Sequence, residues 1–139
     1  SITFAVGNAP ANLANNVVIY YFTKLNLTAD PLARVNVSTA DALITLNMGS
    51  KKQRNFLGSA EIAANKTISV TNVANAIKFV FAFSLDAARV LSLPSDFKSN
   101  DGGWNNATQQ WTAAAGGNYV LEATMVGNYW QAVFHGPNT

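Results

Sequence analysis

The run Ile77-Lys78-Phe79-Val80-Phe81-Ala82-Phe83-Ser84-Leu85 decides how this chain folds. Its odd-numbered positions all carry large apolar side chains. Successive side chains of a β-strand point to opposite faces, whereas helical spacing would scatter these groups around a cylinder. We therefore predict a strand over residues 77–85 whose buried face is formed by Ile77, Phe79, Phe81, Phe83 and Leu85.

Two further apolar runs, Tyr119 to Val126 and Tyr129 to His135, flank the dipeptide Gly127-Asn128. Gly and Asn tolerate the positive φ of the tight turns that close β-hairpins. The spacing therefore predicts a hairpin, which together with the 77–85 strand is expected to build the core. Alternation along the second run adds Trp130 and Phe134 to the predicted core.

Shorter β-prone runs occupy much of the remaining chain. Many short strands without a long 3.6-residue period are typical of an all-β sandwich or barrel. We predict one all-β domain over residues 1–139, an antiparallel, jelly-roll-like β-sandwich with little or no helix. Its further strands are expected at residues 2–6, 17–25, 34–38, 42–48, 67–71 and 90–93.

The other segments are expected to connect these strands. Residues 7–16 are predicted to form a loop or an extended arm, and residues 95–117 a long irregular segment that carries Trp104 and Trp111. The run 56–62 is open to two interpretations, because it reads as a strand while residues 59–65 also suit one helical turn.

The composition is poor in charge. The chain is 49% hydrophobic and 12% charged, against about 25% charged residues in ordinary soluble domains. A surface of neutral polar groups suits a protein that packs against copies of itself or against other proteins. The net charge is +2, and the cluster Lys51, Lys52 and Arg54 contains no aromatic residue, so we expect a solvated loop there and no nucleic-acid partner.

The sequence also bears on compartment and processing. It has no Cys, which excludes disulfides and zinc–thiolate sites. No run approaches the roughly 18 apolar residues of a membrane helix, so no membrane insertion is expected. No signal peptide is recognisable, and we expect a complete small protein that is made inside a cell and begins at Ser1 after removal of the initiator Met.

The residues needed for catalysis are sparse. A nucleophile–base–carboxylate arrangement would have to use His135, the single His. A glycosidase pair could come only from a few acids such as Asp96, Asp101 and Glu122, for which turn roles of the two Asp are favoured. Residues 96–103 resemble a calcium loop but lack its alternating acids and closing Glu. We predict no enzymatic activity, no metal and no cofactor.

An aromatic and amide cluster is the best candidate for binding. Aromatic faces stack on the apolar faces of sugars, and amides satisfy sugar hydroxyls. The competing interpretation is core packing or subunit contact, where aromatic residues are also abundant. The residues predicted to be exposed for contact with a glycan or receptor are Trp104, Asn105, Asn106 and Trp111.

From Arg89-Val90-Leu91-Ser92-Leu93-Pro94-Ser95-Asp96-Phe97-Lys98 onward, the chain resembles the β-sandwich modules of tailed-bacteriophage virion appendages, such as tail fibres and head fibres. Those modules carry a hydrophobic strand, a segment like this one, a Trp-containing loop and a hairpin with Gly-(Thr/Asn)-x-Trp. The counterparts here include residues 79–85 and Gly127-Asn128-Tyr129-Trp130. The similarity covers roughly the last 60 residues.

The resemblance implies a structural protein of the virion, made in the host cytoplasm and acting by protein–protein contact. A capsid decoration protein and a fibre or appendage subunit are both open. The implied partners are copies of the chain, most often as a homotrimer, and other virion proteins, with a glycan of the host surface as a further candidate. The alternative function is a carbohydrate-binding, lectin-like module.

Overall fold

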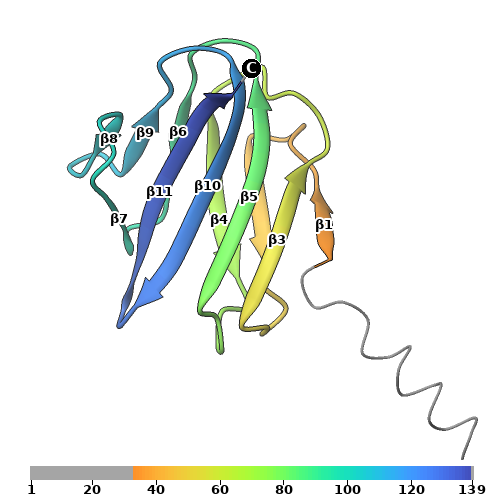
Figure 1. The fold of residues 1–139 in the computed structure, drawn as a ribbon, viewed down its shortest axis with the longest axis vertical. Coiled ribbons are helices and arrows are strands. Elements are labelled where there is room, and N and C mark those ends of the chain that lie inside the picture. The colour runs from red at the N-terminus through yellow and green to blue at the C-terminus, as the bar shows by residue number, and fades with distance from the viewer. Residues whose placement is uncertain (1–32, 139) are drawn as a thin grey trace, which may run out of the picture. The chain divides into compact units, whose positions relative to one another are not determined.

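The structure is a computed structural model that describes residues 33–138. These residues form two β-sheets packed face to face (Figure 1). The six-stranded sheet has the order β1 (Arg34–Val37), β3 (Gln53–Gly58), β5 (Lys78–Leu85), β10 (Gly117–Val126), β11 (Tyr129–Asn138) and β7 (Phe97–Ser99). The five-stranded sheet has the order β2 (Leu43–Asn47), β4 (Lys66–Thr71), β6 (Val90–Ser92), β9 (Gln110–Thr112) and β8 (Trp104–Asn105). Residues 33–138 contain no helix, which confirms the predicted all-β sandwich.

The first six strands wind alternately between the two sheets. As a result β1, β3 and β5 run parallel in one sheet, and β2, β4 and β6 run parallel in the other. Parallel neighbours need a crossover connection, and here each crossover is a strand of the opposite sheet. Antiparallel pairing, as predicted, joins β10 to β5 and β11. For the first six strands the antiparallel prediction is wrong, because alternation encodes the face of a side chain and not the direction of its neighbour.

Strand β5 lies inside the six-stranded sheet and supplies the centre of the core. Its burial alternates as predicted, with Phe79 and Phe81 fully buried. The Phe79 ring packs edge-on against Trp130, with centroids 5.1 Å apart. On the hairpin, Phe134 stacks on Trp111 at 4.3 Å. The predicted core positions confirmed as buried are Phe79, Phe81, Phe83, Leu85, Trp130 and Phe134.

Ile77 is a correction to the predicted core, because its side chain is 47% exposed. It precedes the first residue of β5, at the end of the sandwich where the chain arrives from β4. Its backbone still extends the ladder, since the Ile77 N–H donates to the Lys52 carbonyl at 2.7 Å and its own carbonyl accepts from Met125 N–H at 2.7 Å. The alternation of apolar residues in the sequence thus continues to Ile77, which lies beyond the part of β5 that the five-stranded sheet covers.

Several predicted boundaries also change. Strand β3 begins at Gln53, inside the predicted polar loop, and ends at Gly58, while Ile62 forms a single bridge to Leu85. Neither a strand through residue 62 nor a helical turn is present there. The segment 95–117, predicted to be irregular, contains β7, β8 and β9. The predictions for residues 2–6, 7–16 and 17–25 lie outside the described residues.

Replacing a core ring should cost far more stability than replacing the exposed Ile77. We expect Phe81→Ala to lower the free energy of unfolding by about 3–5 kcal/mol, because it removes buried area and leaves a cavity. The control Ile77→Ala should cost about 1 kcal/mol or less, as surface substitutions do. Urea denaturation of both variants measures the difference, and equal losses would contradict the observed end of the core.

Candidate functional site

The two Trp residues predicted to be exposed are brought together, but they differ in burial. Trp104 and Trp111 are cross-strand partners in the β8–β9 hairpin. Trp111 is only 3% exposed, and its Nε1 donates to Asp101 Oδ1 at 3.0 Å. The prediction of an exposed Trp111 is therefore wrong: its ring faces the core, where it stacks on Phe134.

Trp104 and its two neighbouring Asn residues form the remainder of the predicted contact cluster. The Trp104 ring is partly buried and packs against the core. Asn105 Oδ1 accepts from the N–H groups of Ala107 and Thr108, at 2.9 and 3.2 Å. Asn106 accepts from Gln109 Nε2, through its carbonyl at 2.9 Å and through Oδ1 at 3.4 Å. The side-chain oxygens of both Asn residues therefore accept hydrogen bonds within this turn.

Asp101 is the organising residue of this region. Its Oδ1 accepts from Gly103 N–H at 2.9 Å as well as from Trp111, and its carbonyl accepts from Trp104 N–H at 3.0 Å. A Cβ at Gly103 would lie 2.4 Å from the Thr112 carbonyl oxygen, so only Gly fits there. The turn role predicted for Asp101 is confirmed. Its bond to Trp111 was missed, although the sequence Asp-Gly-Gly-Trp is the local signal of such a turn.

The single His belongs to a charged cluster on the outer face of the six-stranded sheet. Glu122 Oε1 lies 2.9 Å from His135 Nε2, and Oε2 lies 3.3 Å from Lys78 Nζ. All three side chains are substantially exposed on the open face of the sheet. In residues 33–138 no group of three or more His, Cys, Asp or Glu side chains could hold a metal ion. The arrangement is a surface network in which Glu122 forms an ion pair with Lys78 and contacts His135.

Around this cluster the outer face of the six-stranded sheet carries apolar side chains among polar and charged ones, with Arg34 and Asn55 in the same cross-strand row as Val80 and Glu122. This face is turned toward the viewer in Figure 1, with the five-stranded sheet behind it. Leu57, Ala82 and Val120 are cross-strand neighbours in one row, and Val80, Glu122 and Val133 in the next. Val133 is 46% exposed. We call the surface formed by Leu57, Val80, Ala82, Val120, Val133 and the Glu122 cluster the outer face.

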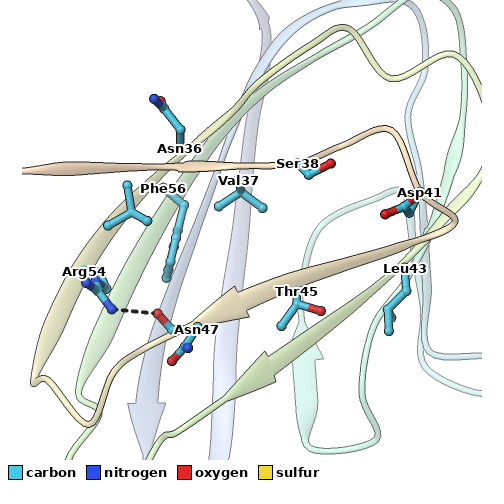
Figure 2. A pocket seen from close by; sticks show the side chains of 10 residues that line it. Asn36, Val37, Ser38, Asp41, Leu43, Thr45, Asn47, Arg54 and Phe56 are labelled. Atoms are coloured by element: carbon cyan, nitrogen blue, oxygen red, sulfur yellow. Dashed lines mark hydrogen bonds between the residues drawn. The ribbon is translucent and has the colours of Figure 1, made fainter.

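Among residues 33–138, β1 and β2 are the outermost strands at one end of the sandwich, and a groove opens between them (Figure 2). Its volume is about 460 Å³. Val37 and Phe56 point into it from the six-stranded sheet, and Leu43, Thr45 and Asn47 line it from β2. Arg54 spans the gap and donates to the Asn47 carbonyl at 3.0 Å. The groove combines an apolar floor with a polar rim.

In the turn between β5 and β6, an ion pair shifts the pKa of a carboxyl group. Arg89 Nε and Nη2 donate to the two carboxylate oxygens of Asp86, at 2.8 and 2.7 Å. This hydrogen bonding lowers the pKa of Asp86 below 3.8. The pair therefore stabilises the fold at pH values above the pKa that Asp86 has in the unfolded chain. This stability is lost as the pH falls through the lower pKa that Asp86 has in the folded chain. Because the pair lies at the surface, its contribution is small.

Comparison with known proteins gives no relative on which to base a function. No family model, curated protein or solved structure matches the chain. Within residues 33–138, no helix has the length and apolar character needed to cross a membrane.

Removing the Asp101 carboxylate should destabilise the fold. Asp101→Ala leaves the buried Trp111 Nε1 and the Gly103 N–H without their acceptor, which is expected to cost about 1–3 kcal/mol. Asp101→Asn retains an acceptor oxygen and should cost less. In a Trp111→Phe background, which lacks the indole donor, the cost of Asp101→Ala should shrink. Denaturation of the four variants measures these differences, and an unchanged cost in the Trp111→Phe background would argue against the bond.

Proposed function

We propose that this chain is a structural subunit of a tailed-bacteriophage particle, a capsid decoration or fibre protein that acts by protein–protein contact. Its main partners are copies of itself, with a homotrimer as the expected form, and other proteins of the virion. The observation that supports the proposal most directly is the outer face of the six-stranded sheet. The resemblance of residues 79–134 to appendage modules supplies the phage context.

The outer face has the chemistry of a contact surface. Apolar side chains such as Val133 remain exposed on a regular, wide sheet. Burying such area against another subunit releases about 25 cal/mol per Å², and a stable interface needs about 800 Å² on each partner. Six adjacent strands provide a surface on which an interface of this kind can form.

The contacts of Glu122 at the centre of the outer face are compatible with burial. Glu122 lies between Lys78 and His135, so its carboxylate keeps its partners when the face is covered. Burying a charge with its partner costs much less than burying a lone charge. Only 12% of the residues of the chain are charged, so burial of other parts of the surface would also cover few charges.

Carbohydrate binding is a second candidate, favoured by one feature of the five-stranded sheet. Asn105, Gln110, Ser92 and Thr67 lie in one cross-strand row, so amides and hydroxyls follow one another across four strands. Gln110 Nε2 donates to Ser92 Oγ at 3.1 Å. Trp104 precedes Asn105 in β8, and its ring points to the other face of the sheet, where it packs against the core. Such an uncharged polar row suits the hydroxyl groups of a sugar, which would serve attachment to a host surface.

A charge placed in the outer face should weaken self-association without unfolding the chain. We expect Val133→Lys to shift the protein from an oligomer toward the monomer, because the added ammonium would be desolvated at the interface. Val73→Lys, at a similarly exposed Val in the β4–β5 turn, is the matched control and should associate as the unaltered protein does. Sedimentation velocity over a range of concentrations measures the difference. A strictly monomeric unaltered protein with no affinity for a capsid or fibre would contradict the proposal.

Sugar binding, if it is the function, should depend on the polar row. Glycan-array binding should fall at least about tenfold in Gln110→Ala, which corresponds to roughly 1.4 kcal/mol of lost binding energy, and should also fall in Asn105→Ala, on the neighbouring strand of the row. Trp111→Ala is unsuitable as a control because that side chain is buried; Thr124→Ala, on the other sheet, serves instead. Binding that both test variants retain would exclude this surface.

A further inference from the structure

Exposed large apolar side chains gather at one end of the sandwich. Five such side chains are exposed among residues 33–138, and three of them lie in or beside the β4–β5 and β10–β11 connections. These three are Val73, Ile77 and Val126. Figure 1 shows both connections, together with the β2–β3 connection, at the end opposite the C-terminus. We call the surface formed by Val73, Ile77 and Val126 the apolar tip.

Backbone hydrogen bonds tie the three connections at this end to one another. The Ile77 N–H donates to the Lys52 carbonyl, and the Ile77 carbonyl accepts from the Met125 N–H, both at 2.7 Å. A further bond joins the Ser50 N–H to the Asn72 carbonyl at 2.8 Å. The apolar tip is therefore a preformed surface, and preformed surfaces bind with a lower ordering cost.

Basic side chains accompany the apolar tip. They come from the β2–β3 connection and from the first two positions of β3 and β5, and they are Lys51, Lys52, Arg54 and Lys78. Lys51 and Lys52 are exposed, and within residues 33–138 neither forms an ion pair. The acids nearest this end are Glu122, which pairs with Lys78 at 3.3 Å, and Asp96, beside β7 beyond the hairpin. Positive charge is therefore in excess around the tip.

The opposite end of the sandwich carries acids. Strands β1, β3 and β5 are parallel neighbours, so the connections that follow them leave the sheet at the same end. These connections contain the exposed residues Asp41, Glu61 and Asp86. Asp86 is paired with Arg89, and the buried Lys66 contacts the Asp41 carbonyl. The carboxylates of Asp41 and Glu61 form no ion pair within residues 33–138, so an anionic surface would attract the apolar tip and repel this end.

We propose that the apolar tip docks on the surface of an anionic lipid bilayer, and that no segment crosses it. Apolar side chains are stabilised at the boundary between headgroups and acyl chains, and lysine side chains near the surface attract anionic headgroups. A soluble polyanion would match the lysines but would leave Val73, Ile77 and Val126 in water, whereas a bilayer accommodates both. The inference goes beyond the proposed contact between proteins and does not depend on it.

Co-sedimentation with vesicles tests the apolar part of the contact. The unaltered protein should bind vesicles of phosphatidylcholine with about one third phosphatidylglycerol, and should bind pure phosphatidylcholine vesicles far less. Ile77→Asp should weaken binding at least about tenfold, because it places a charge where the apolar side chain meets the acyl region. Leu43→Asp is the matched control at the opposite end, since Leu43 is 51% exposed and Ile77 is 47% exposed. This variant should bind as the unaltered protein does.

The lysines are tested by removal of their charge. Replacing both Lys51 and Lys52 by Gln should weaken binding at least about tenfold, because each lysine beside an anionic bilayer contributes about a factor of five. The pair Arg34→Gln and Lys98→Gln removes the same charge from exposed positions on β1 and β7 and should have a much smaller effect. Raising the salt concentration should weaken the binding of the unaltered protein, because salt screens the attraction.

A fluorescent label shows which end meets the bilayer, because the unaltered chain has no Cys that would compete for it. A nitrobenzoxadiazole label on Ile77→Cys should shift its emission to shorter wavelength when anionic vesicles are added. The same label on Leu43→Cys, at the opposite end, should not shift.

The other results would overturn the inference. A folded, oligomeric protein that does not bind anionic vesicles would remove the bilayer contact and leave the proposed function intact. Equal losses in Ile77→Asp and Leu43→Asp, or equal shifts of the two labels, would place the contact elsewhere on the molecule. Binding that Ile77→Asp retains and salt removes would reduce the contact to adsorption by charge alone. A strictly monomeric protein that binds vesicles as described would instead support the inference while removing the proposed self-association.

Discussion

The packing of aromatic rings between the two sheets is the interaction on which the rest of the structure depends. Phe79, Phe81 and Phe83 all point from β5 to the same side, where Trp130 and Trp111 meet them from the hairpin and from the five-stranded sheet. Buried aromatic residues carry large apolar areas, and their edge-to-face contacts add about 0.5–1.5 kcal/mol per pair. Because the large side chains of β5 all lie on its inner face, its outer face carries the smaller side chains and a polar side chain that has an ion-pair partner.

The winding of the first six strands sets the positions of the outer face and of the groove. Each turn of the chain adds one strand to each sheet, and among residues 33–138 the two stacks of parallel strands end at β1 and β2. The C-terminal hairpin closes the fold on the other side of β5 through antiparallel pairing. The outer face and the groove are therefore consequences of one topology.

Alternation made the inner face of β5 predictable, because the period of a strand encodes the face of each side chain. The hairpin turn was predictable from the dipeptide Gly127-Asn128. Alternation could not reveal the direction of pairing or the end of the core at Ile77, since both depend on where the facing sheet lies. The burial of Trp111 was missed because its strand, Gln110–Thr112, is too short to show a period. The groove joins residues such as Val37 and Leu43 from different sheets, which no local pattern indicates.

Hydroxyl-radical footprinting as a function of protein concentration tests most directly whether the outer face is a contact surface between copies. If it is, oxidation of Val133 and Leu57 should fall as the concentration rises, while oxidation of Val73 and Ile77, exposed at the end of the sandwich, should stay constant. Equal oxidation of Val133 at every concentration, in a protein that remains folded, would contradict it.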